Sequence, residues 1–161
     1  MTKDIPQMAS VVLVRDDQIL LGYKKTGLGK GKYVCVGGHI DEGETPLQAA
    51  IRETQEEIFI DLAPAHVRLA AIMDFIFPAK NHWQATCHYF YCDNWDGTPK
   101  ESDEIAPRFY PKEDAPYDQM WQDARHWLPQ ILAGSPPLLC SFTYADDNES
   151  IASFTIEPLN N

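Results

Sequence analysis

The sequence predicts a single α+β domain in which strands outnumber helices. The chain has 161 residues, of which 44% are hydrophobic and 23% are charged, and this size and composition are typical of one globular domain. Short β-prone segments bounded by turn residues recur along the chain, whereas helical spacing is confined to two regions. Because no repeat, linker or low-complexity run divides the sequence, residues 1–161 are expected to form one domain.

The first predicted elements are a hairpin, a loop and a short strand. β-Prone residues on both sides of Arg15-Asp16-Asp17 predict the hairpin. A segment rich in Gly and Lys predicts the loop, and the strand after it runs into Gly37-Gly38. The expected ranges are 8–14 and 18–23 for the hairpin, 24–32 for the loop and 33–36 for the strand.

A helix is predicted to begin directly after Glu44. Thr45 is a good N-cap, Pro46 suits the first helical position, and Gln48 completes a Thr-x-x-Gln capping box. Five mostly apolar residues recur at helical spacing, so they lie on one side of this helix, and that side is expected to pack on a sheet. Its residues are Leu47, Ala50, Ile51, Thr54 and Ile58.

Two strand pairs and a second helical region complete the chain. Residues 117–132 have helical spacing, in which Pro129 must kink the helix or begin a new one. The strand pairs are expected at 67–77 with 84–92, and at 141–144 with 151–156.

The charge balance excludes several classes of ligand. Lys and Arg total 13 against 24 Asp and Glu, a formal net charge of −11. Such a surface repels nucleic-acid polymers and anionic membranes, so neither is expected as a partner. No apolar run is long enough to span a bilayer, and no signal peptide is visible. A polyanionic ligand would therefore have to be held by something other than net charge, and bound metal is the obvious candidate.

The four cysteines suggest a reducing compartment. Cys35, Cys87, Cys92 and Cys140 form neither a CxxC pair nor a disulfide-like framework. Free, buried thiols are the expected state, and they indicate a cytoplasmic protein.

Three carboxylates share one side of the predicted helix. Glu53, Glu56 and Glu57 lie at i, i+3 and i+4, opposite the side that packs on the sheet. They repel one another unless they are solvated or share a divalent cation. Taken alone, they favour a solvated acidic face over a metal site.

Their spacing relative to earlier residues resembles the Nudix box, G-x5-E-x7-R-E-U-x-E-E-x-G-U, in which U is a bulky residue. Thr54 departs from the first U, and Phe59 replaces the final Gly, which bears on helix termination more than on chemistry. The matching residues are Gly38, Glu44, Arg52, Glu53, Glu56, Glu57 and Ile60.

Similarity to the MutT-type oxidised purine nucleoside triphosphate diphosphatase branch, in its vertebrate-like form, extends from about residue 9 to 157. It is carried by residues 20–25, 97–104 and 120–123, with Trp127. The resemblance implies an α/β/α Nudix sandwich with a mixed sheet and a loop-helix-loop box. It also implies dependence on Mg²⁺, or possible use of Mn²⁺. The implied reaction converts a purine nucleoside triphosphate such as 8-oxo-dGTP into monophosphate and pyrophosphate.

The resemblance also implies roles for individual residues. Glu56 or Glu53 is the leading general base, with Glu104 as a third candidate, although residues 101–104 by themselves resemble a solvated loop. Gly38, Glu44 and Arg52 are assigned structural roles, with Arg52 pairing with Glu44 or Glu56. The implied metal ligands are the Gly37 carbonyl, Glu53, Glu56, Glu57 and Glu104.

The substrate-binding residues implied are Lys24, Val34, Trp121 and Asp123. Trp121 would stack on the base, although tryptophans at helical spacing, Trp127 especially, are often core residues. Asp123 would read the base, unless it caps the helix at Ala124. The family has an Asn where Val34 stands and a second acid where Ala124 stands, so weaker preference for oxidised purines is expected.

Two alternatives remain open. The chain could be another nucleoside-diphosphate-X pyrophosphatase that acts on ADP-ribose or a dinucleotide. It could also be a non-catalytic nucleotide-binding module, although the intact Glu53, Glu56 and Glu57 argue against loss of turnover. In every case a monomer that binds a small nucleotide is expected.

Overall fold

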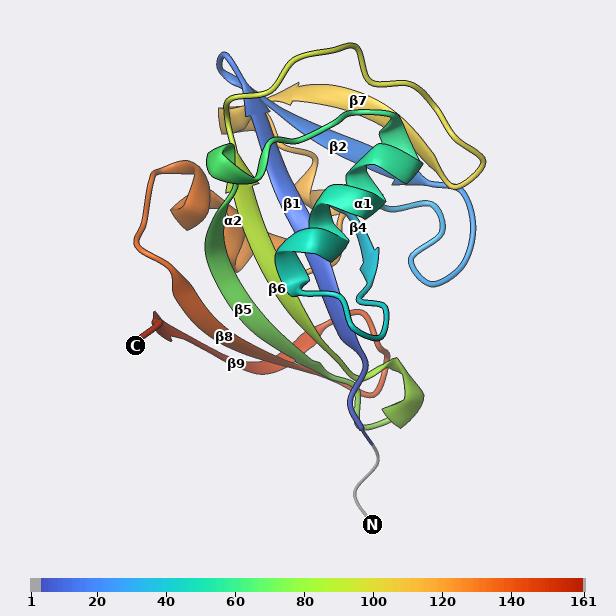
Figure 1. Ribbon diagram of the computed structural model, residues 1–161. Coiled ribbons are helices and arrows are strands. Elements are labelled where there is room, and N and C mark those ends of the chain that lie inside the picture. The colour runs from blue at the N-terminus through green and yellow to red at the C-terminus, as the bar shows by residue number, and fades with distance from the viewer. Residues whose placement is uncertain (1–3, 161) are drawn as a thin grey trace.

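The computed structural model describes residues 4–160, which form one mixed sheet and two α-helices (Figure 1). The strand order is β3-β2-β1-β6-β5-β8-β9, with β4 also paired to β1 and β7 to β2. The β1/β6 and β5/β8 pairs are parallel and the others are antiparallel. The strands are β1 (Gln7–Arg15), β2 (Gln18–Lys24), β3 (Tyr33–Val34), β4 (Val36–His39), β5 (Arg68–Ile76), β6 (Ala85–Cys92), β7 (Ile105–Pro111), β8 (Leu138–Tyr144) and β9 (Ile151–Pro158).

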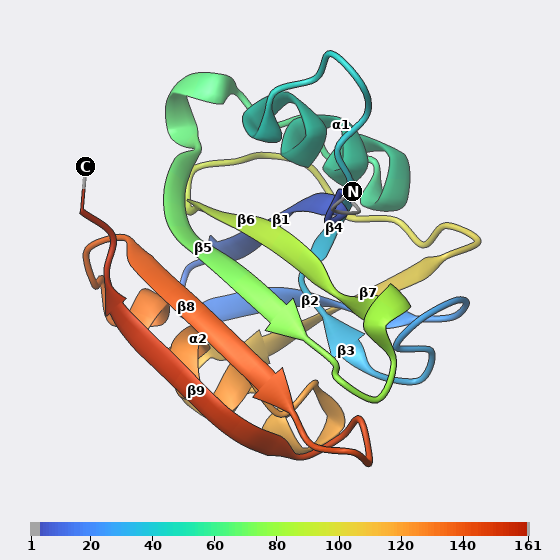
Figure 2. The same cartoon turned by 90° about the horizontal axis from the view of Figure 1, so that it is seen from below.

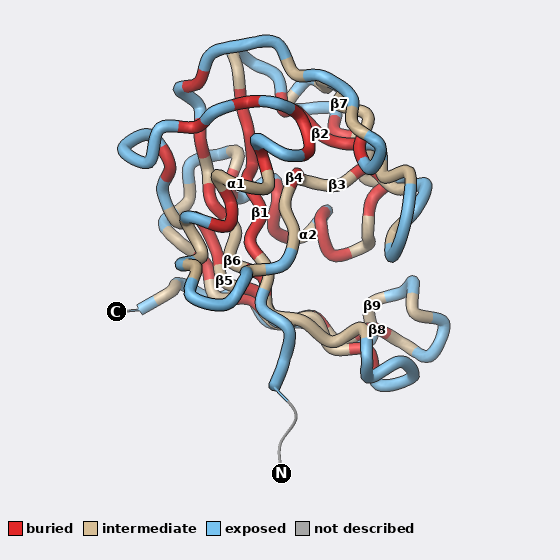
Figure 3. Tube along the Cα trace, turned by 45° about the vertical axis from the view of Figure 1, so that its right-hand side comes forward, coloured by how far each residue is buried: buried red, intermediate tan, exposed pale blue. Residues whose placement is uncertain are grey.

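The helices α1 (Pro46–Ile58) and α2 (Ala124–Leu132) cover opposite faces of this sheet (Figure 2). Alternate residues of β1 supply both cores, since Val11 belongs to the same core as Ala50 of α1, while Val12 belongs to the same core as Trp127 of α2. Burial is concentrated in the strands and the inner sides of the helices (Figure 3). The expected α+β sandwich is confirmed. Neither helix has the length and apolar character needed to cross a membrane.

All three expected strand pairs are present. The β1/β2 hairpin turns at Asp16, whose φ is 56°, with Arg15 opposite Gln18. The antiparallel pairs β5/β6 and β8/β9 also form as expected, and β8 and β9 are longer than the sequence indicated.

The predicted strand over residues 33–36 is wrong in one respect, because it is two strands. Tyr33–Val34 pairs with β2, whereas Val36–His39 pairs with β1, so the chain changes partner at Cys35. The second of these strands continues through Gly37 and Gly38, which lie opposite Ser10 and Ala9 of β1.

The sequence did not predict β7, and it overestimated the second helix. Pro107 and Pro111 lie in β7, which pairs with β2 alone among the described strands. An edge strand tolerates proline because the backbone on its free side has no neighbouring strand to which an N–H must donate. The second helix begins at Ala124 and continues through Pro129, so no new helix begins there. Tyr117–Gln119 forms a short 3-10 turn and Met120 is extended.

Helix α1 begins and ends at defined caps. The Thr45 hydroxyl accepts a hydrogen bond from Gln48 N at 3.1 Å, and Gln48 Oε1 accepts one from Thr45 N at 2.9 Å. Both bonds of the predicted capping box are therefore present. At the other end Phe59, with φ 62°, adopts the left-handed conformation and donates its N–H to Gln55 O. A phenylalanine thus ends the helix where the family motif has glycine.

Replacement of Phe59 by glycine is expected to stabilise the protein. A non-glycine residue in the left-handed region costs about 1–2 kcal/mol, and Phe59 is 51% exposed, so little packing would be lost. Because glycine also loses more backbone entropy on folding, we expect a net gain of about 1 kcal/mol, or about 3 °C in Tm. Thermal unfolding of Phe59→Gly measures this gain. Phe59→Ala, which keeps the strain, should show none.

Candidate functional site

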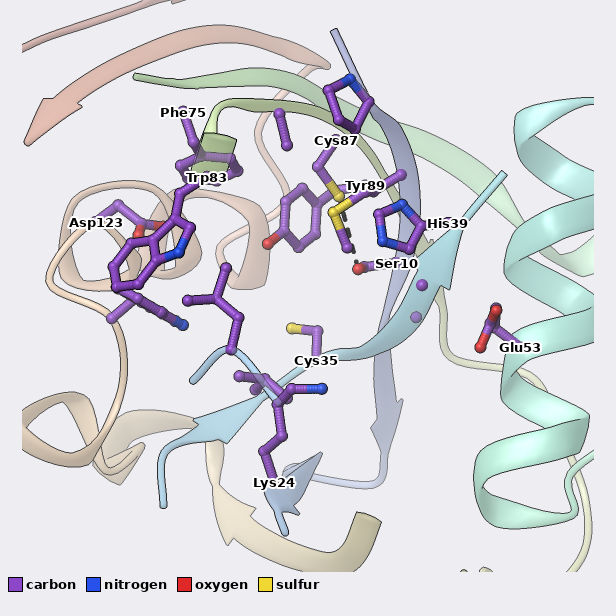
Figure 4. A pocket seen from close by; sticks show the side chains of 18 of the residues that line it. Ser10, Lys24, Cys35, His39, Glu53, Phe75, Trp83, Cys87, Tyr89 and Asp123 are labelled. Atoms are coloured by element: carbon purple, nitrogen blue, oxygen red, sulfur yellow. Dashed lines mark hydrogen bonds between the residues drawn. The ribbon is translucent and has the colours of Figure 1, made fainter. Parts of the chain in front are cut away.

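One cavity of about 780 Å³ joins the two groups of residues singled out from the sequence. Its acidic end lies between α1 and β4, and its aromatic end lies beside the start of α2. Figure 4 shows Glu53 and Asp123 on opposite sides of it. Glu44 and Arg52 lie outside its lining. The predicted residues that line it are Lys24, Val34, Gly37, Gly38, Glu53, Glu56, Glu57, Glu104, Trp121 and Asp123.

Glu57 is the most deeply buried carboxylate at the acidic end. It is only 5% exposed, and its Oε1 accepts a hydrogen bond of 2.8 Å from Gly37 N. Burial raises the pKa of Glu57 to about 7, although the Gly37 N–H and the charge of Lys24 act in the opposite direction. The solvated acidic face considered from the sequence is therefore wrong for this residue.

Glu53 packs against backbone that has no side chain. A Cβ added at Gly38 would lie 2.6 Å from the Glu53 carboxyl carbon, so the close approach requires glycine. Burial raises the pKa of Glu53, the Arg52 guanidinium lowers it, and the charges of Glu56 and Glu104 raise it further. Glu56 itself is exposed.

Arg52 connects the loop before α1 to the helix. Its guanidinium donates to both carboxylate oxygens of Glu44, at 2.6 and 2.9 Å, and to the His39 carbonyl at 3.1 Å. It also donates to Glu53 at 3.0 Å and Glu56 at 3.2 Å. The hydrogen bonds from Arg52 hold the pKa of Glu44 down at about 2. Arg52 thus pairs with both partners proposed from the sequence, in the geometry that an orienting residue needs.

Glu104 reaches the acidic end on an anchored loop. Lys25 N donates to Glu104 O at 2.8 Å, while the Lys25 ammonium donates to Ser102 O at 2.8 Å and pairs with Glu101. Glu104 is exposed, as a solvated loop residue would be. It nevertheless lines the cavity, and its charge raises the pKa of both Glu53 and Glu57.

The oxygen ligands at this end fit a hard divalent cation. Mg²⁺ binds carboxylates and carbonyls while keeping several waters, and the buried Glu57 charge lacks an ion-pair partner in residues 4–160. In that same range no three His, Cys, Asp or Glu side chains already form an ion cage. A hard divalent cation at this end would therefore be held by a few carboxylate and carbonyl oxygens together with waters and substrate phosphates.

Asp123 is the buried polar group at the aromatic end. It is 4% exposed, and its Oδ2 accepts a hydrogen bond of 2.7 Å from Trp127 Nε1. Its Oδ1 accepts one from the Tyr144 hydroxyl. Burial raises its pKa. Asp123 occupies the N-cap position of α2 but makes no side-chain cap bond, so the capping role considered from the sequence is wrong.

The two tryptophans of this region have different environments. Trp127 is 2% exposed and belongs to the core, as its spacing suggested. Trp121 is partly exposed and meets Phe77, Trp83 and Tyr144 edge to face, with ring centroids 5.9–6.4 Å apart. A partly exposed aromatic surface at the cavity wall can receive a planar ligand.

Several lining residues were missed in the sequence. Cys87 and Tyr89 are two positions apart on β6, so both face the cavity. This period of two was the available signal, but the sequence did not reveal which face of the strand met a ligand. The other missed residues include Ser10, Cys35, His39, Phe75, Phe77 and Trp83.

Comparisons with known proteins agree with this geometry. Residues 5–131 match the model of the NUDIX domain. The oxidized purine nucleoside triphosphate hydrolase of Danio rerio is 37% identical over 122 residues, 76% of each chain. The hydrolase of the same name from Mus musculus is 28% identical over 150 residues, 93% of each chain. The mutator MutT protein of Bacillus halodurans has a TM-score of 0.83 at 22% identity, covering 97% of this chain and all of that one. The chain belongs to the Nudix hydrolase family.

Proposed function

We propose that this enzyme hydrolyses purine nucleoside triphosphates, including oxidised ones such as 8-oxo-dGTP, to monophosphate and pyrophosphate with Mg²⁺. The observation that carries the proposal is a single cavity with carboxylates at one end and an aromatic wall with a buried acid at the other. A nucleotide has the same polarity, with phosphates at one end and a planar base at the other. The vertebrate relatives named above are oxidized purine nucleoside triphosphate hydrolases.

The acidic end is assigned the phosphate chemistry. Nudix hydrolases generally use divalent metal ions, and such an ion, Mg²⁺ or Mn²⁺, would supply electrostatic stabilisation of the charge that develops on the phosphates. Its proposed ligands are the Gly37 carbonyl, Glu53, Glu56, Glu57 and Glu104.

Water is proposed to attack one phosphorus of the bond between the α and β phosphates. Its oxygen joins phosphorus as the anhydride bond breaks, and its proton passes to a carboxylate, for which Glu53, Glu56 and Glu104 are the candidates. Arg52 keeps Glu53 and Glu56 oriented through its 3.0 and 3.2 Å hydrogen bonds. Lys24, which lines the cavity and acts electrostatically on Glu57, is proposed to contact the phosphates.

The aromatic end is assigned the base. Trp121 offers a stacking surface, Asp123 retains a lone pair on each oxygen beyond its bonds to Trp127 and Tyr144, and Val34 presents no polar atom. Because a site with fewer hydrogen-bonding groups rejects analogues less strongly, we expect modest preference for 8-oxo-dGTP over dGTP.

The products distinguish this reaction from its alternatives. Purified enzyme with Mg²⁺ should release pyrophosphate rather than orthophosphate from dGTP and 8-oxo-dGTP, and ¹⁸O-water should label only one product. Release of orthophosphate with a nucleoside diphosphate would contradict the proposal. Higher kcat/KM on ADP-ribose, reduced nicotinamide dinucleotide or diadenosine polyphosphates would favour the other pyrophosphatases, and no turnover on any of these would favour a binding module.

Replacement of Asp123 by asparagine is expected to change the ranking of purine triphosphates. Asparagine cannot accept from both Trp127 and Tyr144 in the present arrangement, so Tm should also fall. The measurement is kcat/KM for 8-oxo-dGTP, dGTP, dATP and dCTP below the unfolding transition. Asp118→Asn is a matched control, because Asp118 is exposed and does not line the cavity. A lower Tm with unchanged ranking would exclude Asp123 from base recognition.

The four cysteines support a reducing compartment such as the cytoplasm. All four are free; three are buried and Cys35 is half-buried in the cavity wall. Free thiols of this kind are typical of intracellular proteins. We also propose that residues 1–161 act as one monomeric domain, which sedimentation equilibrium would test.

A further inference from the structure

Tyr89 projects a hydroxyl into the aromatic end of the cavity. Its ring lies against Trp127, with centroids 4.5 Å apart, and Trp127 in turn donates to Asp123. Figure 4 shows the hydroxyl pointing away from Ser10 and His39, toward the side where Trp83 and Asp123 lie. The ring is therefore held by the core while its polar atom faces the space proposed for the base.

The phenol is neutral throughout the physiological range. Burial raises its pKa well above the ordinary value of 10.0, and the nearby Cys87, Cys35 and Asp123 raise it further. A neutral phenol can both donate and accept a hydrogen bond. It lies close enough to the Cys87 thiol to lower the pKa of that thiol, and a thiol is a weak hydrogen-bonding group. A stronger partner for this hydroxyl would have to enter the cavity.

Much of the wall at this end is apolar. Val34, Met120 and Phe77 present hydrocarbon or sulfur, and Asp123, an acceptor when ionised, already uses one lone pair of each oxygen for Trp127 and Tyr144. In a mostly apolar pocket, a few placed polar groups decide orientation and specificity. The hydroxyl of Tyr89 is such a group, and it can exchange its weak contact with the Cys87 thiol for a hydrogen bond to a ligand.

We propose that Tyr89 is a specificity-determining residue whose hydroxyl hydrogen-bonds the polar edge of the purine base. The inference deepens the proposed function and rests on it, because it assumes that the base occupies the aromatic end. Tyr89 then supplies the hydrogen bond that the apolar Val34 cannot make.

Tyr89→Phe removes the hydroxyl and keeps the ring against Trp127. Calorimetry with dGMP and dAMP should show binding weakened about tenfold for the preferred nucleotide, the usual effect of one lost hydrogen bond. The ratio of the two dissociation constants should change by at least about fivefold, because different base edges use the hydroxyl unequally. The affinity of tripolyphosphate, which has no base, should stay within about twofold. Tyr91→Phe is the matched control, since Tyr91 lies on the same strand outside the cavity lining.

Equal weakening of nucleotides and tripolyphosphate, or an unchanged ratio, would overturn the role of Tyr89. Either result would leave the hydrolysis proposal intact if wild-type enzyme still releases pyrophosphate. A second measurement does not depend on the variant: in wild-type protein labelled at tyrosine ¹³Cζ, dGMP should shift the Tyr89 resonance and tripolyphosphate should not. A Tyr89 resonance insensitive to both dGMP and dAMP would also overturn the inference.

Discussion

Glu57→Gln is expected to lower turnover by at least about 10²-fold, the usual cost of removing one preorganised electrostatic group. The variant keeps an oxygen that can accept the 2.8 Å hydrogen bond from Gly37 N, so the local backbone arrangement should survive. Only the negative charge is lost, and with it the proposed contribution to metal binding. Glu56→Gln should have an effect of similar size. Steady-state assays at saturating Mg²⁺ measure both.

Without metal, Glu57→Gln should be more stable than the wild type. Burial moves the pKa of Glu57 from its ordinary 4.5 to about 7, so the folded state disfavours the ionised form. The resulting penalty, about 2 kcal/mol after allowance for relaxation, is fully present above pH 7 and disappears below about pH 4.5. Denaturant unfolding in EDTA at pH 8 and pH 4 should therefore show a gain only at pH 8.

Glu42→Gln is the matched control for both measurements. Glu42 is exposed, lies in the loop before α1, and does not line the cavity. It should change neither turnover nor the pH dependence of stability. Wild-type turnover in both Glu57→Gln and Glu56→Gln would contradict the metal site.

Gly38→Ala is expected to lose activity, whereas Gly37→Ala is expected to lose stability. At Gly38 an added Cβ would lie 2.6 Å from the Glu53 carboxyl group, which is the free end of a flexible side chain. The fold should persist while that carboxylate is displaced. A misplacement of about 1 Å can cost about 10²-fold in rate, so Gly38→Ala should be folded and nearly inactive.

At Gly37 the same Cβ would lie 2.2 Å from the Ala9 carbonyl oxygen and 2.6 Å from Ser10 Cα. Backbone atoms of a central strand cannot move aside, and overpacking of this kind costs about 1–3 kcal/mol or more. Gly37→Ala should therefore lower Tm by several degrees, whereas Gly38→Ala should stay close to the wild type. Thermal unfolding followed by circular dichroism measures the loss of stability, and activity assays on the same variants measure the loss of turnover. A stable, fully active Gly38→Ala variant would show that activity does not require the Glu53 carboxylate to lie against Gly38.

The best sequence predictions concern features built from neighbouring residues. Helix α1 begins at Pro46 because Thr45 and Gln48 can bond each other's backbone, and its inner side packs on β1 and β4 as the spacing of Ala50 and Ile58 indicated. These interactions span one or two helical turns, so the local sequence contains them in full.

Elements that depend on distant partners were harder to predict. Strand β7 contains two prolines, which are unfavourable in a strand until β2 supplies one paired edge and the other edge stays free. Residues 117–123 have helical spacing but fold as turns, because Met120 and Trp121 reach the core from an irregular backbone. Apolar spacing alone does not distinguish a helix from an irregular segment whose apolar side chains pack against the rest of the core.

The site too has parts specified by neighbouring residues and parts that depend on distant ones. The sequence alone determined that three glutamates share helix α1, that a glycine pair precedes them and which residues cap the helix, because local spacing and backbone chemistry specify these features. Only the tertiary structure decided that Glu57 is buried while Glu56 is exposed, and that Glu104, Tyr89 and Asp123 line one cavity with them. Burial and proximity depend on how β4, β6 and the loop before β7 pack around α1 and α2, and no local pattern records that packing.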